Sequence, residues 1–370
     1  MKAFNHIQKP TIIVNKLQVM KNITIMADKA ESCGARFRPH FKTHQSAHIG
    51  EWFRNCGVEA ITVSSVDMAE YFAGQGWEDI LIAFPVNIRE IDHLFKLSTQ
   101  TKLGLLVDHV RQAEALINFR KAIQADVWIE LDTGMNRSGV NWRDHGKLEE
   151  IAETIIRSEC LNLKGLLTHA GQTYHAESTE MIRSLFKESV NRITNSHKYL
   201  QEKYDQSFEI SVGDTPGCWL CEEFDTASEI RPGNFIFFDA MMYSLGVCRA
   251  EDIALSVACP VVSKYRSRNE VLIYGGSVHL SKEVIENSNP QNFGFVVTTA
   301  DNHQWKLEKT NIVRSLSQEH GVVKLAPKTF KNIEIGDLLY IIPVHSCLVV
   351  SLLGEYTSTD GELIEAKISV

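Results

Sequence analysis

The stretch Ala125–Gly134, ADVWIELDTG, decides the fold: β-branched, aromatic and other apolar side chains run into Asp132 and a Thr-Gly turn. A short run of this kind is typical of a strand buried on both faces. A segment with helical periodicity follows at 142–158. The same order of strand, polar or glycine-rich turn and helix recurs through the first 240 residues, which predicts strands alternating with helices.

Eight strands are predicted in this region: Arg36–His40, Glu59–Ser64, Asp79–Pro85, Lys102–Asp108, Ala125–Asp132, Leu163–Ala170, Glu209–Gly213 and Glu229–Phe238. The predicted helices include Lys16–Cys33, Val66–Gly74, His109–Ala122, Trp142–Ser158 and Glu180–Lys203. Eight strand–helix units in about 230 residues fit a (β/α)8 TIM-type barrel. An open doubly wound sheet is the alternative, although the GxGxxG turn expected after its first strand is absent.

From about Ala254 the pattern changes to short β-rich runs with little helix between them. These runs are Leu255–Val262, Glu270–Tyr274, Phe293–Thr299, Gly321–Leu325, Leu338–Ile342 and Leu363–Val370. They predict an antiparallel β domain at 251–370, following the barrel at 1–250. The run Thr11–Val14 fits a strand of either domain.

Composition narrows the class of protein. Hydrophobic residues make up 44% and charged residues 23% of the 370, so a globular chain is expected and a disordered or fibrous one is excluded. The net charge of −8 gives no global attraction for nucleic acid or anionic lipid. No apolar run approaches the roughly 20 residues of a membrane helix, and eight cysteines are too sparse for a disulfide scaffold. We therefore expect a cytoplasmic protein with neither nucleic-acid nor membrane partners.

In a barrel, reactive groups gather where the strands end. The first predicted strand runs into Arg38-Pro39-His40-Phe41-Lys42-Thr43-His44. A lysine among cationic neighbours in a partly dry barrel mouth favours the neutral amine, and therefore imine chemistry with a carbonyl compound. The alternative is a solvated basic loop without chemical function.

Two glycine-containing turns could bind a phosphate with backbone N–H groups: Gly213-Asp214-Thr215 and Gly233-Asn234. Either turn alone could equally serve backbone geometry. Late strands of a barrel are nevertheless a usual phosphate site. A lysine and a phosphate site together suggest pyridoxal phosphate, and a class I aldolase or a phosphosugar isomerase are alternatives.

A possible metal site lies at His345-Ser346-Cys347, after the predicted strand Leu338–Ile342. If the strand continued, residues two apart would face the same side, so that an imidazole and a thiolate could bind one ion. The alternative is a satisfied histidine beside a buried cysteine. The pair Cys218 and Cys221 has redox spacing but lies in a predicted helix with no second pair, and we interpret it as packing.

These motifs, in this order, resemble the D-threonine aldolase and D-serine dehydratase family of fold type III pyridoxal-phosphate enzymes, which are related to alanine racemase. The lysine motif and the late Pro343-x-His345-x-Cys347 carry the resemblance. It continues through Asp132-x-Gly134-x-x-Arg137-x-Gly139, Gly213-Asp214-Thr215-Pro216, Glu229-Ile230-Arg231-Pro232-Gly233-Asn234, Phe238-Asp239 and Glu319-His320-Gly321. The resemblance implies a barrel, a C-terminal β domain and a homodimer.

The resemblance also implies roles for single residues. Lys42 would hold the cofactor covalently, Arg137 would lie beside its pyridine ring, and Tyr174 would face the reacting group; these three are the expected catalytic residues. The remaining cofactor-binding residues would be His40, Gly213, Thr215, Gly233 and Asn234. His345 and Cys347 would hold a divalent metal ion, with zinc favoured by the thiolate and manganese as the alternative.

The resemblance implies a lyase for D-3-hydroxy amino acids. A dehydratase acting on D-serine or D-threonine, giving a 2-oxo acid and ammonia, is favoured. Aldol cleavage to glycine and an aldehyde, or racemisation, are alternatives, and a small cofactor-carrying barrel is disfavoured by the extra domain. Two departures from the family pattern bear on the substrate: Val344 replaces an asparagine and Gln172 replaces a histidine, with His169 or His175 as possible substitutes.

Overall fold

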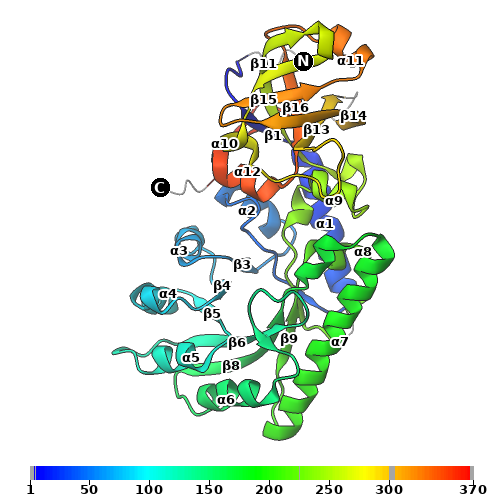
Figure 1. Ribbon diagram of the computed structural model, residues 1–370. Coiled ribbons are helices and arrows are strands. Elements are labelled where there is room, and N and C mark those ends of the chain that lie inside the picture. The colour runs from blue at the N-terminus through cyan, green and yellow to red at the C-terminus, as the bar shows by residue number, and fades with distance from the viewer. Residues whose placement is uncertain (1–3, 5, 225, 300–304, 367–370) are drawn as a thin grey trace. The chain divides into compact units, whose positions relative to one another are not determined.

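The computed structural model describes residues 4, 6–224, 226–299 and 305–366 (Figure 1). Its contacts divide the chain into two compact units. One comprises Ile25–Lys42 and Phe53–Gly233, and the other comprises Met1–Thr24, Thr43–Trp52 and Asn234–Val370. Each unit contains one large sheet, and we call the first the barrel unit and the second the β unit.

The barrel unit is built on eight parallel strands in the order β2-β10-β9-β8-β6-β5-β4-β3. A parallel bridge between His40 and Thr62 joins the two ends of this order, with Phe41 N–H donating to Thr62 O at 2.8 Å. The predicted TIM-type barrel is therefore confirmed. The strands are β2 (Arg36–Phe37), β3 (Ala60–Val63), β4 (Asp79–Pro85), β5 (Lys102–Val107), β6 (Ala125–Asp132), β8 (Leu161–Thr168), β9 (Glu209–Val212) and β10 (Glu229–Ile230); β7 (Val140–Asn141) pairs only with β6.

Helices follow these strands and begin at polar capping residues. Figure 1 shows α3 to α6 along the outer side of strands β3 to β8. Ser65 caps α3 and Ser178 caps α7, each by accepting a backbone N–H bond in the first turn. The helices of the chain up to β10 are α1 (Lys16–Ser32), α2 (Ala47–Arg54), α3 (Val66–Gly74), α4 (Ile91–Ser98), α5 (Val110–Ile117), α6 (His145–Ile156), α7 (Thr179–Tyr204) and α8 (Thr215–Leu220).

Large apolar side chains fill the interior of the barrel unit. Leu81, Leu106, Trp128 and Leu167, from β4, β5, β6 and β8, form one buried cluster. Inward packing of bulky residues from successive strands is what closes a barrel of this size without leaving a pore. Gly165 is required in β8, because a Cβ there would lie 1.9 Å from Glu209 O of β9.

The β unit contains a sheet of nine strands among the described residues, in the order β12-β15-β14-β13-β16-β11-β1-β17-β18. A further pairing between β12 and β11 closes six of them into a ring. All neighbouring pairs are antiparallel except β1 with β17, so the predicted antiparallel β domain is confirmed. The strands are β1 (Thr11–Val14), β11 (Leu255–Tyr265), β12 (Glu270–Tyr274), β13 (Gly294–Thr299), β14 (Trp305–Leu316), β15 (His320–Lys324), β16 (Leu338–Pro343), β17 (Glu355–Ser358) and β18 (Leu363–Glu365).

Two sequence predictions need correction, and a third is described only in part. The eighth barrel strand is not Glu229–Phe238 but ends at Ile230, because Pro232 and Gly233 follow and a 3-10 turn then covers Asn234–Ile236. The strand predicted at Leu363–Val370 is described only as far as β18, and residues 367–370 lie outside the described part. The segment after β16 is not a strand but α12 (Ser346–Leu353). Within the described ranges, no helix is long and apolar enough to cross a membrane.

Candidate active site

A group of cationic and imidazole side chains lies where the barrel strands end. Lys42 follows β2, Arg137 follows β6, His169 follows β8 and Arg231 follows β10. The positive charges of Lys42, Arg231 and Arg137 all act on His40 and on His169. Residues from four separate strand ends are thus brought into one neighbourhood, and Lys42, His40 and Arg137 among them were predicted as site residues.

The turn that carries Lys42 is anchored by its aromatic neighbour. The Phe41 ring is fully buried, and its centroid lies 5.0 Å from those of Phe53, Phe72 and Trp77. Burying an aromatic ring of this size contributes a few kcal/mol to folding, which fixes the turn. Lys42 itself is half-buried, and its backbone N–H donates to His40 Nδ1 at 3.4 Å.

Both imidazoles of the cluster are neutral at physiological pH. Burial, followed by the charges of Lys42 and Arg231, holds the pKa of His40 well below its usual value. Burial and the charges of Lys42 and Arg137 lower the pKa of His169 to about 3. Because Gly213 O can only accept, the 2.5 Å bond to His169 places the proton on Nδ1 and leaves Nε2 as an acceptor.

Arg137 is presented by a turn that Asp132 organises. The Asp132 carboxylate accepts from Gly134 N at 2.9 Å and from Asn136 N at 3.0 Å, an Asx-type turn at the end of β6. Gly139 closes the loop with φ +99°, where a Cβ would lie 2.6 Å from Asp132 N. Arg137 is exposed, so its charge is available to a ligand that approaches from solvent.

Tyr174, Gly213 and Thr215 lie close together after β8 and β9. The Thr215 backbone N–H donates to Tyr174 Oη at 3.2 Å, and the Tyr174 ring centroid lies 6.1 Å from that of His169. Asp214 caps α8 through Gly217 N and accepts from Thr173 Oγ1 at 3.0 Å. Two consecutive strand ends, after β8 and β9, are fastened together in this way.

Arg231 belongs to the same cluster, although it was not among the predicted site residues. It is buried, with Nε donating to Ser211 Oγ and Nη2 to Thr168 O, each at 2.7 Å. Burial lowers the pKa of Arg231 to about 10, so the guanidinium stays charged at neutral pH. The signal that could have revealed it is an arginine at the end of the otherwise buried run of β10.

Other residues of the predicted motifs have surroundings different from those of the Lys42 cluster. Arg38 does not reinforce the charge around Lys42, because it is paired with Asp79 Oδ1 and Glu229 Oε2 at 2.6 Å each. Gly233 is buried at the end of the barrel unit. In the β unit, Asn234 Nδ2 donates to Asp239 at 2.5 Å and to Ser346 Oγ at 3.1 Å, so this side chain is held by protein partners.

His345 and Cys347 are neighbours, but for a different reason than the one predicted. His345 is the N-cap residue of α12 and Cys347 lies in its first turn, so a helix start rather than strand alternation brings them together. Burial lowers the pKa of His345, but the Coulombic interaction with Cys347 and the hydrogen bonds to Cys347 and Glu283 raise it to about 11. Cys347 Sγ also donates to Thr43 Oγ1 at 3.2 Å.

A buried carboxylate fixes the peptide between these two residues. Asp239 Oδ2 accepts from Ser346 N at 3.0 Å and from Ser346 Oγ at 3.3 Å. Burial raises the pKa of Asp239. Asp239, Asn234 and Ser346 therefore form one network that holds the start of α12.

Comparison with known proteins shows the family of the chain. Residues 14–241 match the family described as "Alanine racemase, N-terminal domain", and residues 254–359 match the "Putative serine dehydratase domain". The chain belongs to the alanine racemase-like family. Its dehydratase and aldolase relatives act on D-serine or 3-hydroxyaspartate, and the family uses pyridoxal phosphate.

Two relatives of this alanine racemase-like chain match along most of its length. D-threo-3-hydroxyaspartate dehydratase of Delftia sp. (strain HT23) is 30% identical over 346 residues, 91% of this chain and 90% of the relative. Its solved structure covers 99% of both chains with a TM-score of 0.91. D-serine dehydratase of Dictyostelium discoideum is 28% identical over 98% of this chain and 96% of the relative. A cysteine-to-alanine mutant of a D-threo-3-hydroxyaspartate dehydratase, solved in a metal-free form, matches with a TM-score of 0.90.

The residues present fit the groups that the family implies. Three cationic side chains around two neutral imidazoles suit an anionic cofactor, and a half-buried lysine supplies the amine for a carbonyl group. An imidazole within hydrogen-bonding reach of a thiol is a donor set suited to zinc or a similar divalent ion. Among the described residues, no group of three or more histidine, cysteine, aspartate or glutamate side chains lies together as a metal site would require.

The structure also shows the surroundings of Gln172 and Val344, which depart from the family pattern. Gln172 Nε2 donates to Ser189 Oγ at 2.7 Å, and Val344 is fully buried. His175 is exposed, whereas His169 is in the cluster. Cys218 is buried in α8 and Cys221 is its C-cap; burial raises the pKa of both thiols, consistent with packing rather than redox chemistry.

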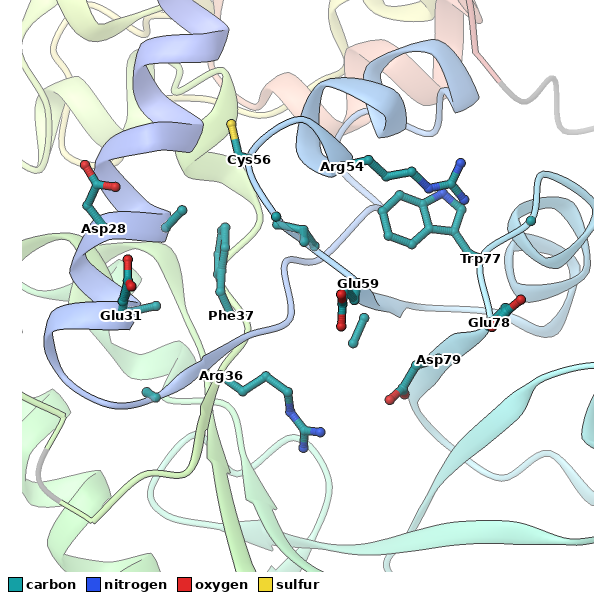
Figure 2. Close-up of a pocket in the computed structure, with 17 residues that line it drawn as sticks. Asp28, Glu31, Arg36, Phe37, Arg54, Cys56, Glu59, Trp77, Glu78 and Asp79 are labelled. Atoms are coloured by element: carbon teal, nitrogen blue, oxygen red, sulfur yellow. The ribbon is translucent and has the colours of Figure 1, made fainter.

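A cavity of about 1100 Å3 lies at the other ends of the barrel strands (Figure 2). It opens at Arg36, Ala60 and Asp79, where β2, β3 and β4 begin. Exposed carboxylates surround it, namely Asp28, Glu31, Glu59 and Glu78. The lining carboxylates outnumber the lining arginines, Arg36 and Arg54, which disfavours a phosphate. Catalytic residues in barrels also gather at the opposite ends, so we do not assign the cofactor to this cavity.

Proposed function

We propose that this chain is a pyridoxal-phosphate- and metal-dependent lyase that converts D-3-hydroxy amino acids, D-serine or D-threonine among them, to 2-oxo acids and ammonia. The observation that carries this proposal is the His345–Cys347 pair at the start of α12, because a metal site distinguishes a lyase for hydroxylated substrates from a racemase. When bound, pyridoxal phosphate supplies a sink for the electrons at Cα, and the metal ion supplies a Lewis acid for a hydroxyl group.

The barrel unit contributes the amine and the positive charge. Lys42 would hold the cofactor through its amine, and the same amine, when free, would accept the proton from Cα of the substrate. Arg137 and Arg231 compensate negative charge, and Arg231 does so from a position fixed by Ser211 and Thr168. Gly213, Thr215 and Gly233 bind the phosphate. Tyr174, whose Oη accepts from the Thr215 backbone N–H, faces the reacting atoms from beside His169.

The β unit contributes the metal ligands. His345 Nε2 and the Cys347 thiolate hold the ion, with zinc favoured because thiolate is a soft ligand. Thr43, which directly follows Lys42 in the chain, accepts the hydrogen bond of Cys347 in the structure and is released when the thiol gives up its proton to bind metal.

Two other reactions use the same cofactor. Aldol cleavage requires a base that removes the proton of the substrate hydroxyl, and His169, neutral with a free acceptor at Nε2, is the candidate. The two 3-hydroxy-D-aspartate aldolases among the relatives, at 25% and 28% identity over about half to two-thirds of the chain, keep this second candidate open. Racemisation needs no metal, so the His345–Cys347 pair argues against it.

The test compares products. The protein is incubated separately with D-serine, D-threonine and D-threo-3-hydroxyaspartate, and 2-oxo acid, ammonia and glycine are quantified. A dehydratase gives 2-oxo acid and ammonia in equal amounts without glycine. Glycine as the main product would replace the proposal with the aldolase, and L-amino acid formed in the presence of chelator would replace it with the racemase.

Cys347→Ala tests the metal in the same assay. We expect the variant to lose the bound ion and to lose at least 100-fold in kcat, because the hydroxyl then leaves without a Lewis acid. The cofactor absorbance should remain, since Lys42 is untouched. Cys259→Ala, which removes a thiol buried in β11, is the matched control. Undiminished turnover in Cys347→Ala would remove the metal from the mechanism.

A further inference from the structure

Glu283 is the carboxylate that contacts the imidazole of His345. Its Oε2 lies 3.0 Å from His345 Nδ1, although the two residues are 62 positions apart in the sequence. Glu283 is on the segment that follows α10 (Ser277–Leu280), and its own backbone N–H donates to Ser281 Oγ at 3.2 Å. The Ser281 side chain is itself buried, so the carboxylate extends from a fixed point of the chain.

The contact determines which ring nitrogen of His345 can bind an ion. An ionised carboxylate only accepts hydrogen bonds, so Nδ1 carries a proton and donates it to Glu283. When the ring gives up one proton to bind a metal ion, the nitrogen that ligates the ion is therefore Nε2. A carboxylate in this position orients the ring and increases the basicity of the ligating nitrogen.

The other acidic neighbour of the pair, Asp239, makes its hydrogen bonds to a different group, although its charge also acts on His345. Asp239 accepts from the backbone N–H and hydroxyl of Ser346 and so holds the main chain of the helix start. Glu283, by contrast, reaches the His345 ring from another segment of the chain. The hydrogen bonds of the two carboxylates therefore hold different groups, since Asp239 holds the backbone and Glu283 holds the imidazole.

We propose that Glu283 is a positioning residue for the metal site, which holds His345 in the tautomer and orientation that binds a divalent ion through Nε2. This inference rests on the proposed metal site. It makes no use of Glu283 as a ligand or as an acid or base toward the substrate.

Metal affinity tests the inference without reference to turnover. Holoenzyme stripped with a chelator is titrated with Zn²⁺ against a chromophoric competitor, for the wild type and for Glu283→Ala, Glu283→Gln and Glu286→Ala. We expect Glu283→Ala to bind Zn²⁺ about 10- to 100-fold more weakly. Glu283→Gln should stay within a few-fold of the wild type, because its amide oxygen also accepts from Nδ1–H. Glu286→Ala removes the same charge from the same segment and should bind as the wild type does.

A spectroscopic readout separates positioning from a general loss of structure. Co²⁺ substituted at the site reports ligand geometry in its visible bands, which should shift in Glu283→Ala and return in Glu283→Gln. The cofactor absorbance and circular dichroism should be unchanged in every variant. Wild-type affinity and an unshifted spectrum in Glu283→Ala would overturn the role of Glu283 and leave the proposed function standing. Absence of stoichiometric Zn²⁺ in the wild type would instead reject the proposed metal site, and this inference with it.

Discussion

Lys42, Arg137 and Arg231 surround two neutral imidazoles with positive charge at the ends of the barrel strands. Like charges gathered in a partly buried place destabilise the folded chain unless a ligand compensates them. The same arrangement favours a doubly charged phosphate and an imine-forming carbonyl compound. This cluster of charged side chains is therefore stronger evidence for pyridoxal phosphate than either glycine turn is.

We expect the free energy of unfolding to depend on pH through the buried side chain of His44. Burial lowers the pKa of His44 to about 3, against an ordinary value near 6.5. Between these values the unfolded chain binds a proton that the folded chain does not, so the free energy of unfolding falls as the pH falls below 6.5. The loss is at most about 1.4 kcal/mol per pH unit.

The measurement is the midpoint of thermal unfolding between pH 7 and pH 4. We expect His44→Gln to show a shallower decline than the wild type, because the titrating group is gone. His109→Gln, at an exposed helix start, is the control and should retain the full decline. Parallel curves for the wild type and His44→Gln would show that His44 does not titrate in this way.

Helix starts on the outside of the barrel unit give a prediction at the scale of elements. Ser178 Oγ accepts from Met181 N at 3.1 Å and begins α7, the 26-residue helix. We expect Ser178→Ala to lower the free energy of unfolding by about 1 kcal/mol, since one N–H of the first turn loses its partner. Ser184→Ala, at an exposed position within the same helix, should leave stability unchanged or raise it slightly. Equal effects of both changes in urea unfolding would contradict the assigned cap.

Helices and strands with a clear pattern of apolar residues could be predicted from the sequence. Elements whose apolar residues suit both a helix and a strand could not. The run at β6 was predicted at its observed bounds, because a strand buried on both faces has an unmistakable composition. By contrast, α12 was missed because Val349 and Val350 of its apolar sequence are also good strand formers. The sequence signal for this helix is Gly354, because a glycine commonly ends a helix. In the structure Gly354 has φ +72° and follows the last residue of α12.

Some residues of the candidate site could likewise be predicted from the sequence, and others could not. Lys42, Tyr174 and Thr215 lie at strand ends, where the fold itself predicts functional residues. His345 and Cys347 were predicted as a pair although the supposed geometry was wrong, because two residues in the first turn of a helix are as near as alternate residues of a strand. Glu283 could not be predicted, because a contact across 62 residues leaves no mark in a single sequence.

At the scale of the whole molecule, we propose that the chain forms a homodimer, as its family resemblance implies. Light scattering coupled to size-exclusion chromatography should give twice the chain mass of 41.8 kDa. The mass should persist at micromolar concentration and in 0.5 M salt if the interface is largely apolar. A stable mass of 41.8 kDa with full activity would show that one chain suffices.

The central claim is that Lys42 carries pyridoxal phosphate, and borohydride reduction followed by peptide mass spectrometry tests it most directly. Reduction converts an imine to a stable secondary amine and so marks the lysine that formed it. We expect loss of the cofactor's visible absorbance and a single phosphopyridoxyl group on the peptide containing Lys42, with none in Lys42→Ala. A modification on another lysine, or a coloured Lys42→Ala protein, would contradict it.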